Sequence, residues 1–228
     1  MGRFRWSVGV TTSLRDGANY LPTTLQSIAA AGWESPTVYS EPGSPVPATH
    51  RASESTVAKG PWPNFFRAVG EMVAKRPAAD AYLIFQDDIY VCRDLRAWLE
   101  PQLWPTVGKQ PGVLSLYTSE FTQRDRPRGW FEIVGDDLPR RCYGALAIVL
   151  PAASARRLLL ARPGRGALAM TEIWLGRFCR EKQLPWVQHC PGFVEHIGDA
   201  STRRRDWNAK TPARRAGKWL SFPPSERP

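Results

Sequence analysis

The sequence predicts a single α/β domain with a mixed, mostly parallel central sheet flanked by helices. Short β-prone apolar segments alternate with segments whose apolar residues recur at helical spacing, which is the pattern of such a sheet. The 228 residues, 43% of them hydrophobic, supply one sizeable core. In this class of fold, ligands bind at the carboxyl ends of the strands.

The first half of the chain is predicted to contain three strands separated by two helices. The strands are expected at Trp6–Thr12, Thr37–Tyr39 and Tyr82–Phe85. Asn19 is expected to cap the first helix, which has Pro22 in its first turn, and the second helix is expected to begin at Asn64 and to end before Pro77. The Pro-, Gly- and Ser-rich segment 41–63 is long enough to indicate a binding loop.

The second half is less regular. Strands are expected at Val113–Leu116, Tyr143–Leu150 and Trp186–Val187, and helices around Ala152–Leu160 and at Thr171–Lys182. A charged loop is expected over 119–141. We therefore expect one domain over 1–202, followed by a basic, Pro-rich tail over 203–228 without a core of its own.

The formal net charge of +10 indicates an anionic partner. Four interpretations of the tail beginning at Arg203-Arg204-Arg205 stay open: a phosphate-binding flap, a surface that attracts acidic acceptors, peripheral membrane association, and a solvated tail, which is the default. Trp207 and Trp219 would also suit stacking on nucleic acid, but no nucleic-acid-binding motif accompanies them. We expect no nucleic-acid partner.

The four cysteines are expected to be reduced thiols, because they show no paired spacing. No segment approaches the roughly 18 consecutive apolar residues of a membrane span, and the first residues lead directly into a predicted strand instead of a signal-peptide core. A cytoplasmic location without a membrane span is therefore expected.

Two polar groups follow predicted strands. Thr11, Thr12 and Arg15 offer hydroxyls and a guanidinium that suit phosphate or base recognition, although an ordinary polar turn is the alternative. Gln86-Asp87-Asp88 follows the strand Tyr82–Phe85, where a carboxylate can reach a divalent cation that bridges a diphosphate. Two adjacent carboxylates at a strand end otherwise have to stay in water.

The ordered series VGVTTSLRDGANYLPTTLQSI, NFFRAV, YLIFQDDIYV, CYGALAIVLP, TEIWLGRFC and PGFVEHIGDAST resembles the nucleotide-sugar-dependent glycosyltransferases of the A-type, Rossmann-like fold. Within them it is most similar to the N-acetylglucosaminyltransferase four family and its bacterial relatives. The resemblance extends from the first strand to Thr202. It implies a nucleotide-sugar-binding half over 1–91 and an acceptor-binding half over 92–202.

The resemblance also implies a donor site. It assigns Asp88 to a manganese or magnesium ion, and Gln86 and Asp87 to the ribose or sugar of a UDP-sugar. Gln86 departs from the usual acid and contributes no charge. Glu41 resembles the acid that contacts the uridine, with a solvated loop acid as the alternative, and Asn64 resembles an asparagine near the donor, with a helix N-cap as the alternative.

His196 resembles the late histidine that completes the metal site, and imidazole is a suitable ligand for manganese. A structural histidine is the alternative. A zinc site could also be built from four side chains of the second half, but the adjacent His189-Cys190 and the lack of a Cys-x-x-Cys pair fit it poorly. Those four residues are Cys179, His189, Cys190 and His196.

Glu172 resembles the acid that faces the acceptor and is the candidate catalytic base. The alternative is structural, because Thr171 could cap the helix and an acid in the first turn favours the helix dipole. Glu120 and Asp137 are the other candidates for the base.

The sequence thus favours a metal-dependent glycosyltransferase that moves a sugar from a nucleotide sugar to a hydroxyl of a glycan. A nucleotidyltransferase and a basic nucleic-acid-binding module are the alternatives from other classes.

Overall fold

The fold was analysed in a computed structural model, which describes residues 4–14, 19–103, 111–123, 126, 128–138, 142, 144–161 and 170–198. The strands of its main sheet are β1 (Trp6–Thr12), β2 (Thr37–Ser40), β3 (Ala52–Glu54), β4 (Ala81–Gln86), β6 (Val113–Ser115), β7 (Gly129–Ile133), β8 (Ala147–Pro151) and β9 (Trp186–Cys190). The helices are α1 (Leu21–Ala30), α2 (Pro61–Lys75), α3 (Leu95–Leu99), α4 (Glu120–Gln123), α5 (Ala152–Leu160) and α6 (Thr171–Glu181), with 3-10 turns η1 (Glu100–Gln102) and η2 (Gly135–Asp137).

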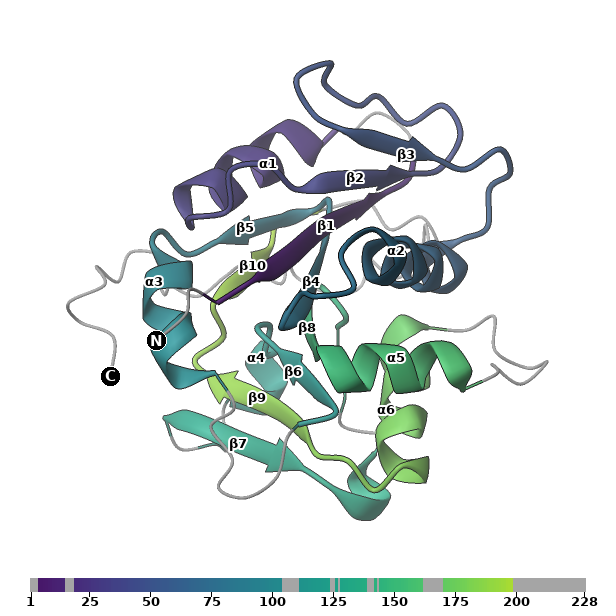
Figure 1. Cartoon of the computed structure of the whole chain (residues 1–228). Helices are drawn as coiled ribbons and strands as arrows, with labels where there is room; N and C mark the ends of the chain where they lie inside the picture. The colour runs from purple at the N-terminus through teal and green to yellow at the C-terminus, as the bar shows by residue number, and fades with distance from the viewer. Residues whose placement is uncertain are drawn as a thin grey trace.

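The main sheet has eight strands in the order β3-β2-β1-β4-β8-β6-β9-β7 (Figure 1). The neighbours β3, β2, β1 and β4 are parallel, β8 is antiparallel to both β4 and β6, β9 is parallel to β6, and β7 is antiparallel to β9. All strands except β8 and β7 therefore point the same way. The predicted mixed, mostly parallel sheet is confirmed.

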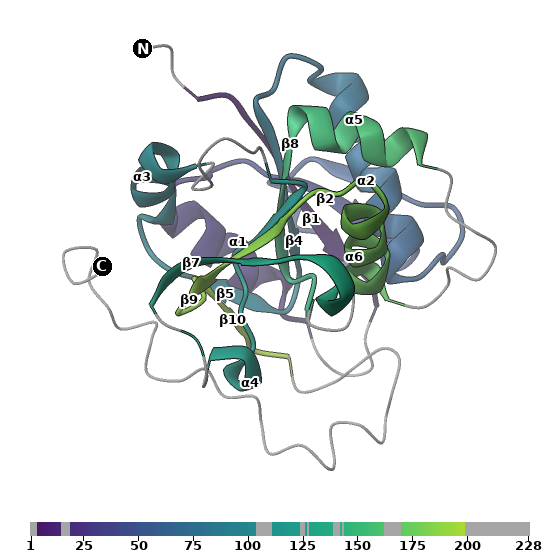
Figure 2. The same ribbon diagram turned by 90° about the horizontal axis from the view of Figure 1, so that it is seen from below.

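Helices cover both faces of this sheet, with α1 and α3 on one side and α2, α5 and α6 on the other (Figure 2). Each face has its own apolar core. Val10, Leu25 and Ile28 belong to the core under α1, whereas Met72, Ile148 and Phe178 belong to the core under α2, α5 and α6. The two-sided burial explains why β4 and β8 are buried along nearly all their residues.

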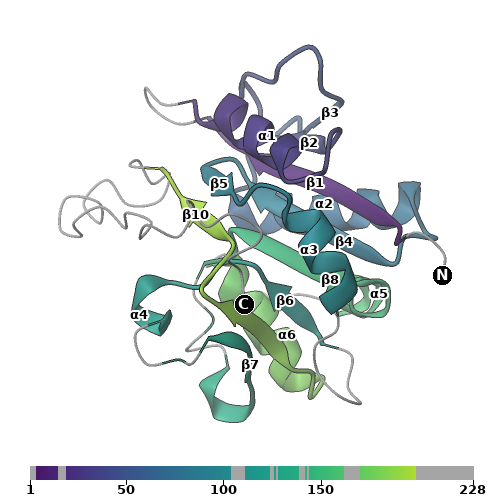
Figure 3. The ribbon, with the colours of Figure 1, turned by 90° about the vertical axis from the view of Figure 1, so that its left-hand side faces the viewer.

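A second, two-stranded sheet pairs β5 (Ile89–Val91) with β10 (Val194–His196) in antiparallel orientation. β5 follows β4 after the two residues Asp87 and Asp88, so the small sheet begins at the edge of the main sheet where β4 ends. Figure 3 shows β10 toward the end of the molecule at which β1 finishes. The pairing of His196 with Ile89 brings the last described segment of the chain next to the Asp87-Asp88 turn.

Several predicted boundaries need correction. The helix expected from Asn64 begins at Pro61 with Gly60 as its N-cap, so Asn64 is not a cap. Tyr20 and Met170, rather than Asn19 and Thr171, are the N-caps of α1 and α6. Short, more exposed elements were also missed: β3 lies in the expected loop 41–63, and α4, β7 and η2 lie in the expected loop 119–141.

The predicted thiols are confirmed, because Cys92, Cys142, Cys179 and Cys190 are all free and buried. Within the ranges given above, no helix combines the length and the apolar character needed to cross a bilayer. Arg15 and the basic tail 203–228 lie outside the described residues.

Candidate functional site

Thr12, the last residue of β1, brings three predicted donor residues together. Its hydroxyl donates to Oδ2 of Asp87 at 2.5 Å. Its carbonyl oxygen accepts the N–H of Glu41 at 3.0 Å and lies 3.5 Å from the side-chain nitrogen of Asn64. These residues are all buried, and they meet where the parallel strands β1, β2 and β4 end.

Thr11 and Gln86 lie at the same edge. They pair with each other in the β1–β4 ladder, and the Thr11 hydroxyl donates to the Phe85 carbonyl at 3.2 Å. The side chain of Gln86 is half-buried, and its backbone N–H donates to Leu146. The Thr11 hydroxyl therefore bonds within the main sheet, whereas the Thr12 hydroxyl bonds to the turn formed by Asp87 and Asp88, hereafter the aspartate turn.

The hydroxyl of Thr24 in α1 contacts the backbone of the aspartate turn. Its fully buried hydroxyl lies 2.7 Å from the carbonyl oxygen of Asp87 and 2.8 Å from that of Ile89, and it accepts the N–H of Ile89 at 3.2 Å. A buried backbone carbonyl without a partner is costly, so this hydroxyl fixes the path of the chain between β4 and β5. Thr24 was not among the predicted site residues, although a threonine on the apolar face of a helix is a recognisable signal.

Asp88 and His196 form a pair beside this turn. Nε2 of His196 lies 2.8 Å from Oδ2 of Asp88, and the backbone N–H of Ile197 donates to the Asp88 carbonyl at 2.9 Å. The Asp88 side chain is 7% exposed and that of His196 is 25% exposed. The pair is therefore open to solvent on the histidine side.

The two side chains fit the chemistry of a divalent cation. Carboxylate oxygen and imidazole nitrogen both bind manganese. Two ligands at right angles around an octahedral ion such as Mg²⁺, with bonds of about 2.0–2.1 Å, lie about 3 Å apart. The observed 2.8 Å is close to that separation. Among the described residues, no group of three or more His, Cys, Asp or Glu side chains is placed to hold a metal ion, at this pair or at any other position. Any cation would thus need further ligands from a donor or from water.

The alternative zinc site is not formed. His189 is 2% exposed and packs among the rings of Trp98, Trp130 and Phe193, with centroid distances of 5.4, 4.9 and 4.4 Å. Cys179 lies in the core under α6, where burial raises the pKa of its thiol and the nearby Cys142 raises it further. Burial likewise lowers the pKa of His189, although the Pro191 carbonyl, 2.8 Å from Nδ1, acts in the opposite direction.

Glu41 closes the loop that precedes α2. Its Oε1 accepts the backbone N–H groups of Lys59 and Gly60 at 2.7 and 2.8 Å, so its carboxylate fixes the start of α2. Asn64, in the first turn of that helix, donates to the Tyr39 carbonyl at 3.0 Å. Both side chains therefore fix the chain where β1 and β2 end and α2 begins.

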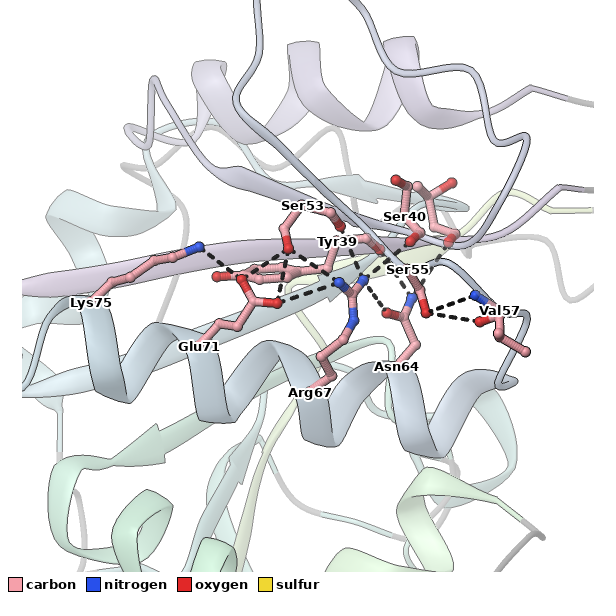
Figure 4. A network of polar contacts seen from close by, with 10 residues as sticks. Tyr39, Ser40, Ser53, Ser55, Val57, Asn64, Arg67, Glu71 and Lys75 are labelled. Atoms are coloured by element: carbon pink, nitrogen blue, oxygen red, sulfur yellow. Dashed lines mark hydrogen bonds and ion pairs between the residues drawn. The ribbon is translucent and has the colours of Figure 1, made fainter.

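Arg67 connects α2 to β2 and β3 (Figure 4). Its Nη2 lies within 3.1 Å of the carbonyl oxygens of Ser40 and Ser53 and of Oδ1 of Asn64. Burial tends to raise the pKa of the neighbouring Glu71, but hydrogen bonds from Lys75 and Ser53 and the charges of Lys75 and Arg67 outweigh it and lower that pKa. Arg67 was missed, although Asn64, Arg67, Glu71 and Lys75 form a polar row at helical spacing.

Glu172 lies in the first turn of α6, at the same end of the molecule as the start of α2. Trp174 of α6 stacks on Trp62 of α2, with ring centroids 5.5 Å apart and planes 15° apart. The start of α2 is tied by a hydrogen bond to Glu41, the residue after β2. Glu172 is close enough to Cys142 for its charge to raise the pKa of that thiol, after the larger effect of burial.

The other two candidates for the base differ in their positions. Asp137 lies in η2, which follows β7, and the last residue of β7, Ile133, pairs with Trp186 at the start of β9. The chain therefore leaves β7 at the edge opposite to the aspartate turn. Glu120 is the first residue of α4, and its side chain lies outside what the structure describes.

Comparison with known proteins identifies the fold. No family profile and no curated sequence matches the chain. Glucosyl-3-phosphoglycerate synthase from Mycobacterium tuberculosis, solved with Mn²⁺, UDP and phosphoglyceric acid, is 15% identical with a TM-score of 0.50, and the match covers 85% of this chain and 71% of that one. S. aureus TarS is 12% identical with a TM-score of 0.52, covering 84% of this chain and 60% of TarS.

At these identities the likeness shows the fold alone, and that fold is the predicted A-type, Rossmann-like one. The narrower resemblance to the N-acetylglucosaminyltransferase four family is not shown by these comparisons and stays a prediction.

Proposed function

We propose that this chain is a metal-dependent, inverting glycosyltransferase that moves a sugar from UDP to a hydroxyl of a glycan acceptor. The main support is the Asp88–His196 pair at 2.8 Å, next to the Thr12–Asp87 contact at the carboxyl ends of β1 and β4. The A-type fold, shared with a synthase solved with Mn²⁺ and UDP, agrees with this assignment. We keep the division into a donor half, 1–91, and an acceptor half, 92–202, as part of the proposal.

In this proposal, Asp88 and His196 would hold a divalent cation, whose positive charge would offset the negative charge of the diphosphate leaving group. Thr12, Asp87, Glu41 and Asn64 are already fixed by mutual or backbone hydrogen bonds, so little side-chain entropy is lost when the nucleotide binds. The remaining donor contacts are assigned to Thr11, Arg15 and Gln86.

Glu172 is the proposed catalytic base. Its carboxylate accepts the proton of the acceptor hydroxyl while that oxygen forms a bond to the anomeric carbon of the sugar. The bond from this carbon to the diphosphate oxygen breaks on the opposite face, and UDP leaves with the electron pair. The stacking of Trp174 on Trp62 favours Glu172 over Asp137, because it keeps the first turn of α6 at the donor end.

Calorimetric titration of UDP, with and without Mn²⁺, tests the proposal. We expect Mn²⁺ to tighten UDP binding in the parent protein and not in Asp88→Asn, because the amide contributes no charge to the cation. Asp136→Asn, an exposed acid in η2, is the matched control and should behave like the parent. Equal metal-dependent affinity in Asp88→Asn and the parent would contradict the metal assignment.

A thermal-stability screen separates the rival classes, because a ligand stabilises the folded state that it binds. UDP-sugars with Mn²⁺ should raise the melting temperature of the parent. Stabilisation by nucleoside triphosphates alone would favour a nucleotidyltransferase, and stabilisation by oligonucleotides alone would favour a nucleic-acid-binding module.

A further inference from the structure

A pocket of about 490 Å³ lies at the edge of the main sheet opposite to the candidate donor site. It is formed by the starts of β1 and β2, by the loop before β3 and by the end of α2, and its lining includes Ser7, Thr37, Arg51 and Arg76. The aspartate turn follows the carboxyl end of β4, whereas this pocket lies where the parallel strands begin. It therefore cannot be a part of the donor site.

Tyr39 reaches this pocket because residue 9 is glycine. Ser7 and Gly9 of β1 lie on the face of the sheet that α2 covers, since side chains alternate along a strand. A Cβ on Gly9 would lie 2.8 Å from Cε2 of Tyr39 and 3.0 Å from Sδ of Met72. The space over Gly9 thus holds the Tyr39 ring, which extends toward the Lys75 end of α2 (Figure 4).

Two largely buried residues that carry a hydroxyl, Tyr39 and Ser7, line the pocket. Tyr39 is 1% exposed and Ser7 is 6% exposed. Burial, followed by the charge of Glu71, raises the pKa of Tyr39 to about 12, against a smaller opposing effect of Arg67. The Tyr39 hydroxyl is therefore protonated at neutral pH and able to donate.

The lining is also rich in positive charge. Arg51, Lys75 and Arg76 line the pocket, and Glu34 is its single acid. Lys75 is ion-paired with Glu71 at 2.7 Å, but Arg51 and Arg76 have no ion pair within the described part of the chain. Guanidinium groups together with hydroxyl donors are the side chains that recognise phosphate oxygens.

We propose that this pocket binds the phosphate group of a small phosphorylated molecule, between the guanidinium groups of Arg51 and Arg76 and the hydroxyls of Tyr39 and Ser7. The volume is within the range of small-molecule sites, about 300–1,000 Å³, so the pocket also has room for the part of the ligand that carries the phosphate. Glu34 could accept hydrogen bonds only from that second part, because a carboxylate repels phosphate.

Isothermal titration with inorganic phosphate tests this site in the full chain without added metal. We expect saturable binding to the parent that weakens roughly tenfold or more in Arg51→Gln/Arg76→Gln and several-fold in Tyr39→Phe, because charged hydrogen bonds are lost. Arg157→Gln/Arg177→Gln removes the same charge from exposed helical positions and is the matched control. Melting temperatures of all variants verify that they are folded.

The control pair should bind phosphate like the parent. Absence of saturable binding to the parent would overturn the proposal. It would also be overturned by an equal loss in the control pair, which indicates attraction by net charge alone, or by unchanged binding in both pocket variants, which places the phosphate elsewhere.

Discussion

Nε2 of His196 lies 2.8 Å from Oδ2 of Asp88, although 108 positions separate the two residues in the sequence. The contact depends on the β5–β10 sheet, in which His196 pairs with Ile89, the residue after Asp88. The backbone of His196 is thus fixed by the small sheet, and the backbone of Asp88 by the turn that leads into that sheet. In the proposed function, a pair fixed in this way would bind a cation without rearrangement of the backbone.

His196→Ala should weaken Mn²⁺-dependent UDP binding roughly tenfold or more, because one of two protein ligands is lost. The measurement is calorimetry at saturating Mn²⁺. His50→Ala changes a histidine near the opposite edge and serves as the control. If His196→Ala binds Mn²⁺ and UDP like the parent, His196 is structural.

Glu172→Gln should lower turnover by about 10²–10⁴-fold at saturating donor and acceptor, as expected for the loss of a general base. Its melting temperature should change little, because a helix-end charge contributes only about 0.3–1 kcal/mol. Asp137→Asn is the control and should retain turnover. Turnover of Glu172→Gln within a few-fold of the parent would refute the base role and move the search to Glu120.

Thr24→Val should lower the free energy of unfolding by about 1–3 kcal/mol, because the carbonyl groups of Asp87 and Ile89 lose their hydroxyl partner in a buried place. UDP affinity should fall with it, since the aspartate turn loses its support. Urea denaturation and calorimetry measure the two effects. Thr24→Ser keeps the hydroxyl and should restore most of both; if it is no better than valine, packing rather than hydrogen bonding explains the loss.

Arg67→Ala should lower the free energy of unfolding by about 2–3 kcal/mol, because three oxygens of β2, β3 and α2 lose a charged donor. Backbone amides in 41–60 should also exchange faster with deuterium, which mass spectrometry of exchanged peptides measures. Arg157→Ala on α5 is the exposed control, expected within about 0.5 kcal/mol of the parent. Unchanged exchange in 41–60 would show that Arg67 does not hold this loop.

His189 should make the protein less stable as the pH falls below 6.5. Burial keeps the pKa of His189 in the folded state below its ordinary value of 6.5, so between these two values the unfolded chain binds the proton more readily. The contribution of neutral His189 to the free energy of unfolding is therefore fully present above pH 6.5 and is lost as the pH falls toward the folded-state pKa. Urea denaturation between pH 5 and 8 should show a shallower decrease in His189→Gln; an identical slope in parent and variant would contradict this role.

Local patterns predicted the elements that carry a strong apolar period. β1 and α5 have the predicted bounds, and α6 differs from its prediction by one residue, because buried strands and amphipathic helices are encoded by neighbouring side chains. The missed strands β3, β7 and β10 are short and have exposed or half-buried residues. Such strands depend on hydrogen bonds to a partner strand, which no local pattern records.

The sequence by itself determined that Thr12 and the Asp87-Asp88 pair follow strands of one α/β sheet, because each strand and its polar end are contiguous in the chain. Only the tertiary structure decided that the Thr12 hydroxyl bonds to Asp87, that Thr24 supports the turn and that His196 meets Asp88. Each of these contacts joins segments more than sixty residues apart, so it depends on strand order and helix packing. The sequence could name the candidate ligands, but their distances follow from the fold as a whole.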